Sequence, residues 1–466
     1  MKKTAVNPYL PLWEYIPDGE PYVFGDRVYV YGSHDLFNGY VFCMGDYMGW
    51  SAPVDDLSDW RCEGVIYPRN ADPVNADGHM CLYAPDVTQG PDGRYYLYYV
   101  LDKVGFVSVA VCDSPAGRYE FLGYVHDKQG RRLGDRPGDE PQFDPGVLTE
   151  GDKTFLYTGF CGRGDKSRHG AMCTVLGPDM VTIEEEPVFV APGCEYEAGT
   201  GFEGHAYFEA ASIRKRGDLY YFVYSSTVMH ELCYATARDP RGPFTYGGVI
   251  VSNCDLGIDS YKPADKIVAF GGNNHGSIVE IAGQWYIFYH RQTNAHWFSR
   301  QGCAEPICFD AEGRIAQAEM TSCGLNGGPL PGQGRYPAAI ACHLFMAEKT
   351  EPYAGDPRRP RITREGREDR SEGFLANISD GTVIGWRDFD CKALKRVSIE
   401  TRAYCHGTFE IRTAWDGPVL GEIPVISSNV WVTGSADVTV PDGVHPLYLT
   451  YRGTGTPQLR AVVLEV

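Results

Sequence analysis

A motif made of a polar residue, a tight turn and an aromatic strand occurs five times in the first three hundred residues, and it constrains the fold more than any other feature. In the clearest copy, Glu209 precedes a turn at 216–218 and the strand LYYFVY at 219–224. Neighbouring copies lie 58 to 68 residues apart, and the other four contain Asp18, Asp86, Asp144 and His275. A repeat of this length with several short strands predicts a five-bladed β-propeller.

The five polar residues are expected to meet at one end of the central channel, because the innermost strand of each propeller blade runs along the axis. Four of them are acidic, and their mutual repulsion and desolvation would destabilise a purely structural protein. A single acid at the start of a strand is explained by solvation of the strand end. Four acids in register favour an active site.

Net charge and hydropathy exclude several classes of partner. The chain has 466 residues and a formal net charge of −19, which disfavours nucleic acid because sites for phosphate backbones are basic. No apolar run approaches the length of a membrane span. The N-terminal stretch MKKTAVNPYLPLWEY has no apolar segment behind its lysines, so we expect a cytoplasmic protein without a secretory signal. The oligomeric state is left open.

The residue composition indicates a mostly β protein. Aromatic residues make up 13% of the chain and are accompanied by 55 glycines and 31 prolines. This mixture is typical of many short strands joined by turns, and of surfaces that bind sugars. The 15 cysteines are scattered and odd in number, so we expect reduced thiols rather than a disulfide framework or a metal site.

The motif ends near residue 326, and a different pattern follows. The stretch GGPLPGQGRYPAA predicts a linker at 327–345. Short alternating strands such as RVSIETRAY and HPLYLTYR predict a jelly-roll-like β-sandwich at 346–466. The predicted fold is therefore all-β, with the propeller at 1–326 as the catalytic domain and the sandwich after it.

Two carboxylates on opposite sides of a sugar can hydrolyse a glycosidic bond. One protonates the leaving oxygen, and the other activates water or attacks directly. Acids on separate blades that face each other across a channel favour the wider separation, which leaves room for water and inverts the anomeric centre. A third acid near the proton donor would raise the donor's pKa by like-charge repulsion. The repeat supplies enough acids for all three roles.

Several motifs resemble glycoside hydrolase family 43, in sequence and in order. They are IPDGEPYVFGDRVYVYGSHD, YAPDV, FEAASIRKRGDLYYFVYSS and GGNNHGSIVEIAGQWYIFYHRQ, and the resemblance covers about residues 7–325. It implies a five-bladed β-propeller and an inverting glycosidase that acts mainly on arabinose- and xylose-containing glycans.

The same resemblance implies a role for each matching residue. Asp18 would be the general base, Asp86 the residue that modulates the pKa of the acid, and Glu209 the general acid. His275 matches a histidine near a calcium ion on the axis; because calcium prefers oxygen ligands, a lone histidine would hold it largely through water. Asp144 lies in an Asp-Pro pair that recurs in the family without a catalytic assignment, so we expect it to be structural.

Two further residues are candidates for substrate binding. His34 returns with the first hairpin to the rim that holds Asp18, and Arg291 follows the fifth aromatic strand onto the rim. For Arg291 the alternative is an ordinary ion pair within the propeller.

The C-terminal part resembles the β-sandwich of carbohydrate-binding module family 6. Its tryptophans could form a sugar platform, but without a fixed motif core packing is favoured for Trp386, Trp415 and Trp431.

We expect an inverting exo-glycosidase that removes terminal α-L-arabinofuranosyl or β-D-xylosyl residues from plant-cell-wall oligosaccharides, without an organic cofactor. Alternatives within the same class are a galactofuranosidase and an endo-acting arabinanase with an open groove. A non-catalytic glycan-binding propeller is an alternative of a different class. It would predict the loss of an acid, yet Asp18, Asp86 and Glu209 are all present.

Overall fold

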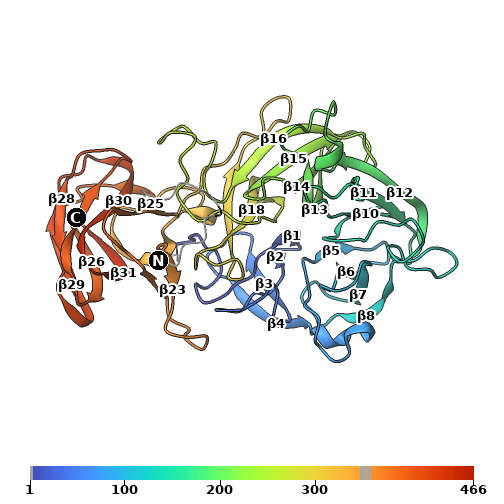
Figure 1. The fold of residues 1–466 in the computed structure, drawn as a ribbon, viewed down its shortest axis with the longest axis horizontal. Helices are drawn as coiled ribbons and strands as arrows, with labels where there is room; N and C mark the ends of the chain where they lie inside the picture. The colour runs from blue at the N-terminus through green and yellow to red at the C-terminus, as the bar shows by residue number, and fades with distance from the viewer. Residues whose placement is uncertain (1–3, 347–352, 354–357) are drawn as a thin grey trace.

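The computed structural model describes residues 4–346, 353 and 358–466, so the first three residues of the predicted propeller lie outside it. Its regular structure consists of strands and short 3-10 helices. Figure 1 shows two bodies: a larger one, coloured blue to yellow, and a smaller one, coloured orange to red, that carries the C-terminus. No helix among the described residues has the length and apolar character needed to cross a membrane.

Residues 20–307 form five antiparallel sheets, each of which is one blade. Blade 1 contains β1 (Glu20–Phe24), β2 (Arg27–Tyr31), β3 (Tyr47–Pro53) and β4 (Arg61–Tyr67). Blade 2 contains β5 (Asp86–Gln89), β6 (Tyr95–Tyr99), β7 (Ser108–Cys112) and β8 (Glu120–Tyr124). Blade 3 contains β9 (Gly146–Glu150), β10 (Lys153–Thr158), β11 (Gly170–Leu176) and β12 (Ile183–Pro192). Blade 4 contains β13 (Tyr207–Arg216), β14 (Leu219–Ser226), β15 (Glu231–Ala237) and β16 (Thr245–Ser252). Blade 5 contains β17 (Ile278–Ile281), β18 (Gln284–Arg291) and β19 (Gln301–Ile307).

The first strands of the blades are neighbours around the axis, since β9 contacts both β5 and β13, and β1 contacts β17. Within each blade the strands pair in chain order, as short hairpins require. The predicted all-β, five-bladed propeller is confirmed, with the difference that blade 5 has three strands in the described residues.

The aromatic strand of each repeat is buried because it is covered on both faces. In β6, Tyr98 packs with residues of blade 3 such as Leu156, whereas Tyr99 packs with Tyr31 of blade 1. Successive side chains of a strand point to opposite faces, so one strand supplies the core on both sides of its blade. This explains why the aromatic residues run consecutively instead of alternating with polar ones.

The N-terminal segment closes the ring by docking on blade 5. The Asn7 side chain is fully buried; its Nδ2 donates to the Ala304 carbonyl at 2.9 Å and to Oε1 of Glu305 at 2.9 Å. Its Oδ1 accepts from the Ala304 N–H at 2.9 Å. One side chain therefore reproduces the pairing that a fourth strand would give to β19.

Two six-stranded sheets form the sandwich. The first contains β20 (Leu330–Pro331), β22 (His343–Met346), β25 (Thr382–Cys391), β27 (His406–Arg412), β28 (Gly421–Pro424) and β30 (Gly443–Thr454). The second contains β21 (Gly334–Pro337), β23 (Arg361–Thr363), β24 (Phe374–Ala376), β26 (Arg396–Ala403), β29 (Ser428–Asp437) and β31 (Gln458–Glu465). The 3-10 helices are η1 (Arg69–Ala71), η2 (Pro73–Asn75), η3 (Cys194–Tyr196), η4 (Gly324–Asn326) and η5 (Ala338–Ile340).

The three tryptophans of the sandwich are packed against other side chains. Trp386 is fully buried in the sandwich core. Trp415 lies against Phe345 with ring centroids 5.3 Å apart. The ring of Trp431 lies 4.5 Å from the Arg402 guanidinium and 4.9 Å from that of Arg460. The expected core packing is therefore found for Trp386, whereas Trp415 and Trp431 are partly buried and lie outside the sandwich core.

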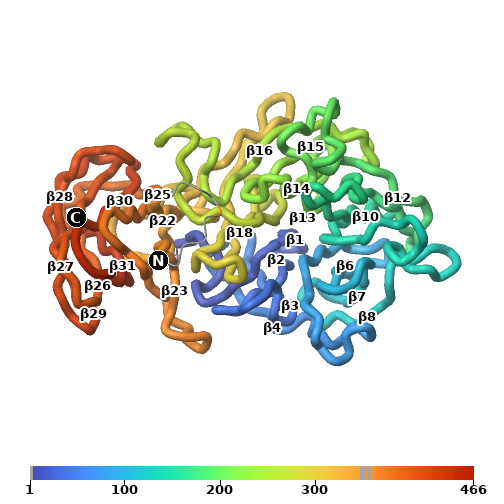
Figure 2. Tube along the Cα trace, viewed as in Figure 1, coloured from blue at the N-terminus to red at the C-terminus, as the bar shows by residue number. Residues whose placement is uncertain are grey.

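The stretch predicted to be a linker, 327–345, is built into the sandwich. It contributes β20, β21 and most of β22, and these strands pair with β25 and β31. The residues between them, from Ala338 to Cys342, are completely buried. Leu344 donates its N–H to the Val268 carbonyl of the propeller at 2.7 Å. Figure 2 shows β22 on the side of the smaller body that faces the propeller. Glycine and proline suggested a free linker, but the apolar residues after them require burial.

We predict that Asn7→Ala destabilises the propeller by about 2–3 kcal/mol, because it removes the buried partner of both the N–H and the carbonyl of Ala304. The measurement is thermal unfolding of wild type and variant at equal concentration. The exposed Asn70 gives a control. Similar melting temperatures for Asn7→Ala and Asn70→Ala would contradict the closing role.

Candidate active site

A cavity of about 650 Å³ opens among the blades of the propeller. Four of the five polar residues of the sequence motif line it: Asp18, Asp144, Glu209 and His275. Aromatic side chains form much of the remaining wall, namely Phe42, Tyr83, Phe143, Phe160, Phe208, Trp297 and Phe298. The structure therefore gathers the predicted acids in one site, with Asp86 as the exception.

Asp18 and Asp144 reach the cavity through the same backbone conformation. Asp18 lies two residues before β1 and Asp144 two residues before β9, and both have a left-handed φ, of 56° and 43°. Aspartate tolerates this conformation better than most residues. The corresponding position before β5 is Ala84, which also lines the cavity.

Glu209 reaches the cavity from inside β13 by way of a bulge. The pairing of β13 with β14 shifts register between Glu209 and Ser212, and Ala210 has a φ of +66°. A bulge of this kind re-aims the neighbouring side chain. The N–H of Ala210 is not lost, because it donates to Oδ2 of Asp144 at 3.0 Å. Asp144 thus holds the backbone directly after Glu209.

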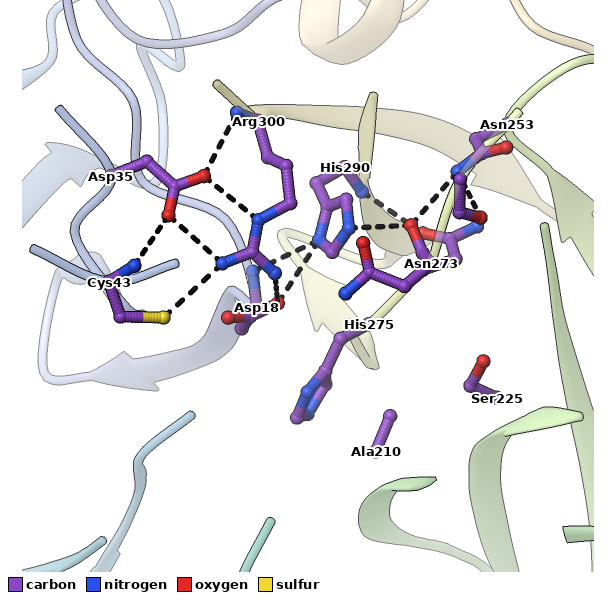
Figure 3. Close-up of polar contacts among 12 residues, drawn as sticks. Asp18, Asp35, Cys43, Ala210, Ser225, Asn253, Asn273, His275, His290 and Arg300 are labelled. Carbon is purple, nitrogen blue, oxygen red and sulfur yellow. Dashed lines mark hydrogen bonds and ion pairs between the residues drawn. The ribbon is translucent and has the colours of Figure 1, made fainter. Parts of the chain in front are cut away.

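Asp18 lies in a network of buried cationic and neutral donors (Figure 3). Nη1 of Arg300 donates to Oδ1 of Asp18 at 2.8 Å, while the same guanidinium makes two further bonds to Asp35, at 2.9 and 3.0 Å. Nε2 of His290 donates to the Asn273 carbonyl at 2.8 Å, which leaves Nδ1 to accept the N–H of Asp18 at 3.2 Å.

This network keeps Asp18 ionised. Burial alone would raise the pKa of Asp18, but the Arg300 guanidinium, with a smaller contribution from His275, outweighs it and holds that pKa well below its ordinary value. Burial lowers the pKa of His290, in keeping with a neutral ring. A permanently ionised carboxylate is suited to accept a proton from water.

Glu209 has the opposite electrostatic environment. Burial and the nearby charge of Asp144 raise the pKa of Glu209 to about 8, although His275 partly opposes them. Burial also raises the pKa of Asp144, but only to about 6, because His275 offsets part of the rise. Burial and the charge of Asp144 therefore favour the protonated form of Glu209. A protonated carboxyl is suited to donate a proton to a leaving oxygen.

The residue whose charge acts on Glu209 is thus Asp144, which corrects two sequence-based expectations. Asp144 was expected to be structural and Asp86 to modulate the acid. Asp86 does not line the cavity; it is the first residue of β5 and pairs with Tyr98. The sequence motif places Asp86 and Asp144 at equivalent positions of their repeats. In the structure Asp86 is the first residue of its strand, whereas Asp144 lies two residues before its strand.

Asp86 belongs to a second polar layer between the blades. Its carboxylate accepts from the Tyr22 hydroxyl at 2.7 Å and from the Val147 N–H at 2.7 Å, so it connects blades 1, 2 and 3. Glu20, the first residue of β1, lies in the same layer and pairs with Arg214 at 2.7 Å. These contacts give Asp86 a role in holding the blades together.

His34 and Arg291 do not line the cavity, which corrects the expectation that they contact substrate there. Nε2 of His34 lies 3.1 Å from Oε1 of Glu14 at a separate depression. The Arg291 guanidinium donates to the carbonyls of Ala341 at 3.3 Å and Cys342 at 2.8 Å. Arg291 therefore fastens β18 to the segment that leads into the sandwich.

His275 lies on the cavity floor between two carboxylates, with ring nitrogens 3.7 Å from Asp144 and 3.7 Å from Glu20. Burial would lower its pKa, but Glu20 and Asp144 raise the pKa of His275 to about 9. Calcium takes six to eight oxygen ligands. Among the described residues beside this ring, Glu20 has one buried carboxylate oxygen, Oε1, without a hydrogen-bond partner, which leaves that oxygen free for a cation. These donors cannot surround calcium unless water completes most of its shell.

Arg300 is the main functional candidate that the sequence motif does not reveal. It lies directly before β19, the third strand of its blade, whereas the motif covers the first two strands. Arg291 and Gln301 are paired across β18 and β19, so the start of β19 returns to the end of the blade at which β18 finishes. The antiparallel return of β19 was the signal from which the position of Arg300 near the cavity could have been predicted.

The chain matches the model of glycosyl hydrolases family 43 over residues 26–315. It is also similar along its whole length to a protein of Thermoclostridium stercorarium named xylosidase/arabinosidase. The two are 63% identical over 470 residues, which cover 100% of this chain and 99% of that protein.

Solved structures share the fold. An arabinoxylan arabinofuranohydrolase of family 43 from Bacillus subtilis, in complex with cellotetraose, has a TM-score of 0.53 and 21% identity, covering 98% of this chain and 97% of that one. A β-xylosidase/α-arabinofuranosidase from a compost metagenome, in complex with xylotriose and in a calcium-free form, has a TM-score of 0.53 and 26% identity, covering 68% and 98%. The family model and the relative that is 63% identical, together with a pocket lined by several carboxyl groups, show that the chain is a glycoside hydrolase and belongs to family 43.

Proposed function

We propose that this enzyme is an inverting exo-glycosidase that removes terminal α-L-arabinofuranosyl or β-D-xylosyl residues from plant-cell-wall oligosaccharides. The observation that carries the proposal is one pocket lined by Asp18, which is bonded to Arg300, and by Glu209, whose pKa is raised by burial and by the charge of Asp144. An ionised base and a protonated acid in the same cavity are what hydrolysis by an activated water requires.

In the proposed reaction, Asp18 removes a proton from a water molecule as that water attacks the anomeric carbon. Glu209 gives its proton to the departing glycosidic oxygen as the bond to that carbon breaks. Asp144 takes no part in proton transfer; its charge keeps Glu209 protonated, and its bond to the Ala210 N–H fixes the backbone beside the acid. The charge of Arg300 keeps Asp18 ready to accept the proton.

The choice of sugar is supported by the pocket wall and by the relatives. Aromatic side chains such as Tyr83, Phe143 and Trp297 offer apolar faces on which sugar C–H groups can pack. The relative that is 63% identical is named for both xylosidase and arabinosidase activity. A galactofuranosidase and an endo-acting enzyme remain as outcomes of the assay.

The test compares hydrolysis of the nitrophenyl glycosides of α-L-arabinofuranose, β-D-xylose and β-D-galactofuranose, followed by proton NMR of the released sugar. We expect turnover of the first two and initial release of the inverted anomer. Initial release with retained configuration would mean a covalent intermediate and would contradict the proposed roles. Turnover of linear arabinan from within the chain would indicate an endo-acting enzyme.

We also propose that calcium binds at the propeller axis. A solved relative that is described as a calcium-free form supports this proposal. Glu20 and a His275 that has given up its proton would hold the ion, mostly through water, and the charge of the ion would take the place of the imidazolium among the surrounding acids. Calorimetric titration of chelator-treated protein should show one calcium site that His275→Ala removes. Equal binding by wild type and variant would exclude this location.

Glu209→Gln should lower activity on natural linkages by about 10²- to 10⁴-fold, because a leaving sugar needs protonation. A dinitrophenyl glycoside, whose leaving group departs without protonation, should lose far less. Steady-state rates on both substrates provide the measurement. An equal loss on both would remove Glu209 from the role of proton donor.

Asp144→Asn should move the basic limb of the kcat/KM profile to lower pH. Removing the neighbouring negative charge lowers the pKa of Glu209, so the acid loses its proton earlier as pH rises. Asp86→Asn is the matched control, since Asp86 is buried but lies outside the cavity. It should reduce the melting temperature and leave the basic limb in place. If Asp86→Asn moved the basic limb and Asp144→Asn did not, Asp86 would be the residue that modulates Glu209.

Arg300→Gln should move the acidic limb of the same profile to higher pH. The guanidinium lowers the pKa of Asp18, so its removal lets Asp18 take up a proton sooner as pH falls. Arg291→Gln changes another buried arginine of blade 5 and should leave that limb unchanged. If both variants keep the wild-type acidic limb, Asp18 does not depend on Arg300.

A further inference from the structure

Outside the catalytic pocket, three metal-binding side chains converge beside blade 4. His205, Glu231 and Cys233 place one ligand atom each within 4.8 Å of one another. Nδ1 of His205 is 2.6 Å from Oε1 of Glu231, and Sγ of Cys233 is 3.4 Å from that oxygen and 4.0 Å from the histidine nitrogen. None of the three lines the catalytic cavity.

The backbone fixes two of these ligands in advance. Glu231 and Cys233 are the first and third residues of β15, so their side chains lie on the same face of the strand. Glu231 is 5% exposed and Cys233 is fully buried, whereas the His205 side chain is about one third exposed. The cluster is therefore rigid on the side of β15 and open to water on the side of His205.

The charge of Glu231 also points to a cation. It is a buried carboxylate that pairs with no lysine or arginine among the described residues; its ion-pair partner is the imidazole of His205. The Ser226 hydroxyl donates to the same Oε1 at 2.6 Å. Because no lysine or arginine is bonded to this carboxylate among the described residues, a divalent ion would replace only its contact with His205, while the Ser226 hydroxyl stays in place.

We propose that His205, Glu231 and Cys233 form a zinc site, with water as the fourth ligand. Imidazole nitrogen, carboxylate oxygen and thiolate sulfur are the donors that zinc takes in tetrahedral geometry, whereas calcium and magnesium avoid sulfur. On binding, the Cys233 thiol releases its proton to solvent, and neutral His205 binds through Nδ1 with its proton on Nε2.

Zinc at this position joins the loop before β13 to β15. His205 lies four residues before Glu209, and its carbonyl accepts the Tyr224 hydroxyl at 2.8 Å. The Tyr246 ring is stacked on the imidazole, with centroids 5.1 Å apart. The ion would therefore hold in place the loop through which the chain reaches the general acid. This inference does not depend on which glycoside is hydrolysed.

The test uses the full-length protein, freed of metal with a chelator and then titrated with Co²⁺ as a spectroscopic probe and with Zn²⁺ in competition. We expect one ion per chain, a thiolate-to-cobalt charge-transfer band, displacement of that band by zinc, and a higher melting temperature with zinc. Cys233→Ala should lose the band. Cys173→Ala, a buried cysteine of the same hydrophobic cluster, should retain it.

Two results would overturn the proposal: no charge-transfer band in the wild type, or a band that persists in Cys233→Ala and so arises from other thiols, such as the exposed Cys62 and Cys308. If Cys233→Ala does not fold, His205→Ala decides the question, because its side chain is partly exposed. Zinc affinity should then fall at least about tenfold. An unchanged affinity would exclude His205 as a ligand.

Discussion

The ion pair between Arg300 and Asp18 is the interaction on which the rest of the site depends. Both groups are nearly completely buried, and the guanidinium also spans Asp35, so one cation serves two carboxylates. Separating one partner from such a pair would leave a buried charge unbalanced, which is strongly unfavourable. His275 and Arg300 also lower the pKa values of Asp144 and Glu209. At Glu209, burial and the charge of Asp144 outweigh both cations and favour the protonated form.

The propeller fold positions these acids, which differ in pKa, around one cavity. Each acid enters the cavity from a different blade, and left-handed backbone at Asp18 and Asp144, together with the bulge after Glu209, directs the side chains to the axis. The second layer, with Asp86, Glu20 and Arg214, connects the blades beside that cavity. The acids can remain close together because the strands and buried hydrogen bonds, including those accepted by Asp86 and Asp144, hold the blades in place.

The sequence predicts the blades well because each repeat carries its own local signals: a turn, an aromatic strand and a polar residue. Asp18 and Glu209 were found in this way. The roles expected for Asp86 and Asp144 came from the family resemblance, and the repeat did not separate the two residues. Access to the cavity depends on the distance from the strand start, because Asp144 lies two residues before β9 whereas Asp86 is the first residue of β5. Arg300 was missed because its proximity to Asp18 spans 282 residues of sequence. The segment at 327–345 was misjudged because its buried alanines have no strand pattern.

The most direct test of the central claim is a pH titration of the Glu209 carboxyl itself, followed by ¹³C NMR with labelled glutamate side chains. Comparison with Glu209→Gln identifies the resonance that belongs to this residue. The account predicts a carboxyl that loses its proton near pH 8, because burial and Asp144 raise the pKa of Glu209 to about 8. A resonance that titrates at the ordinary value for a glutamate, near 4.5, would show that Glu209 is ionised at neutral pH and would contradict its role as the acid.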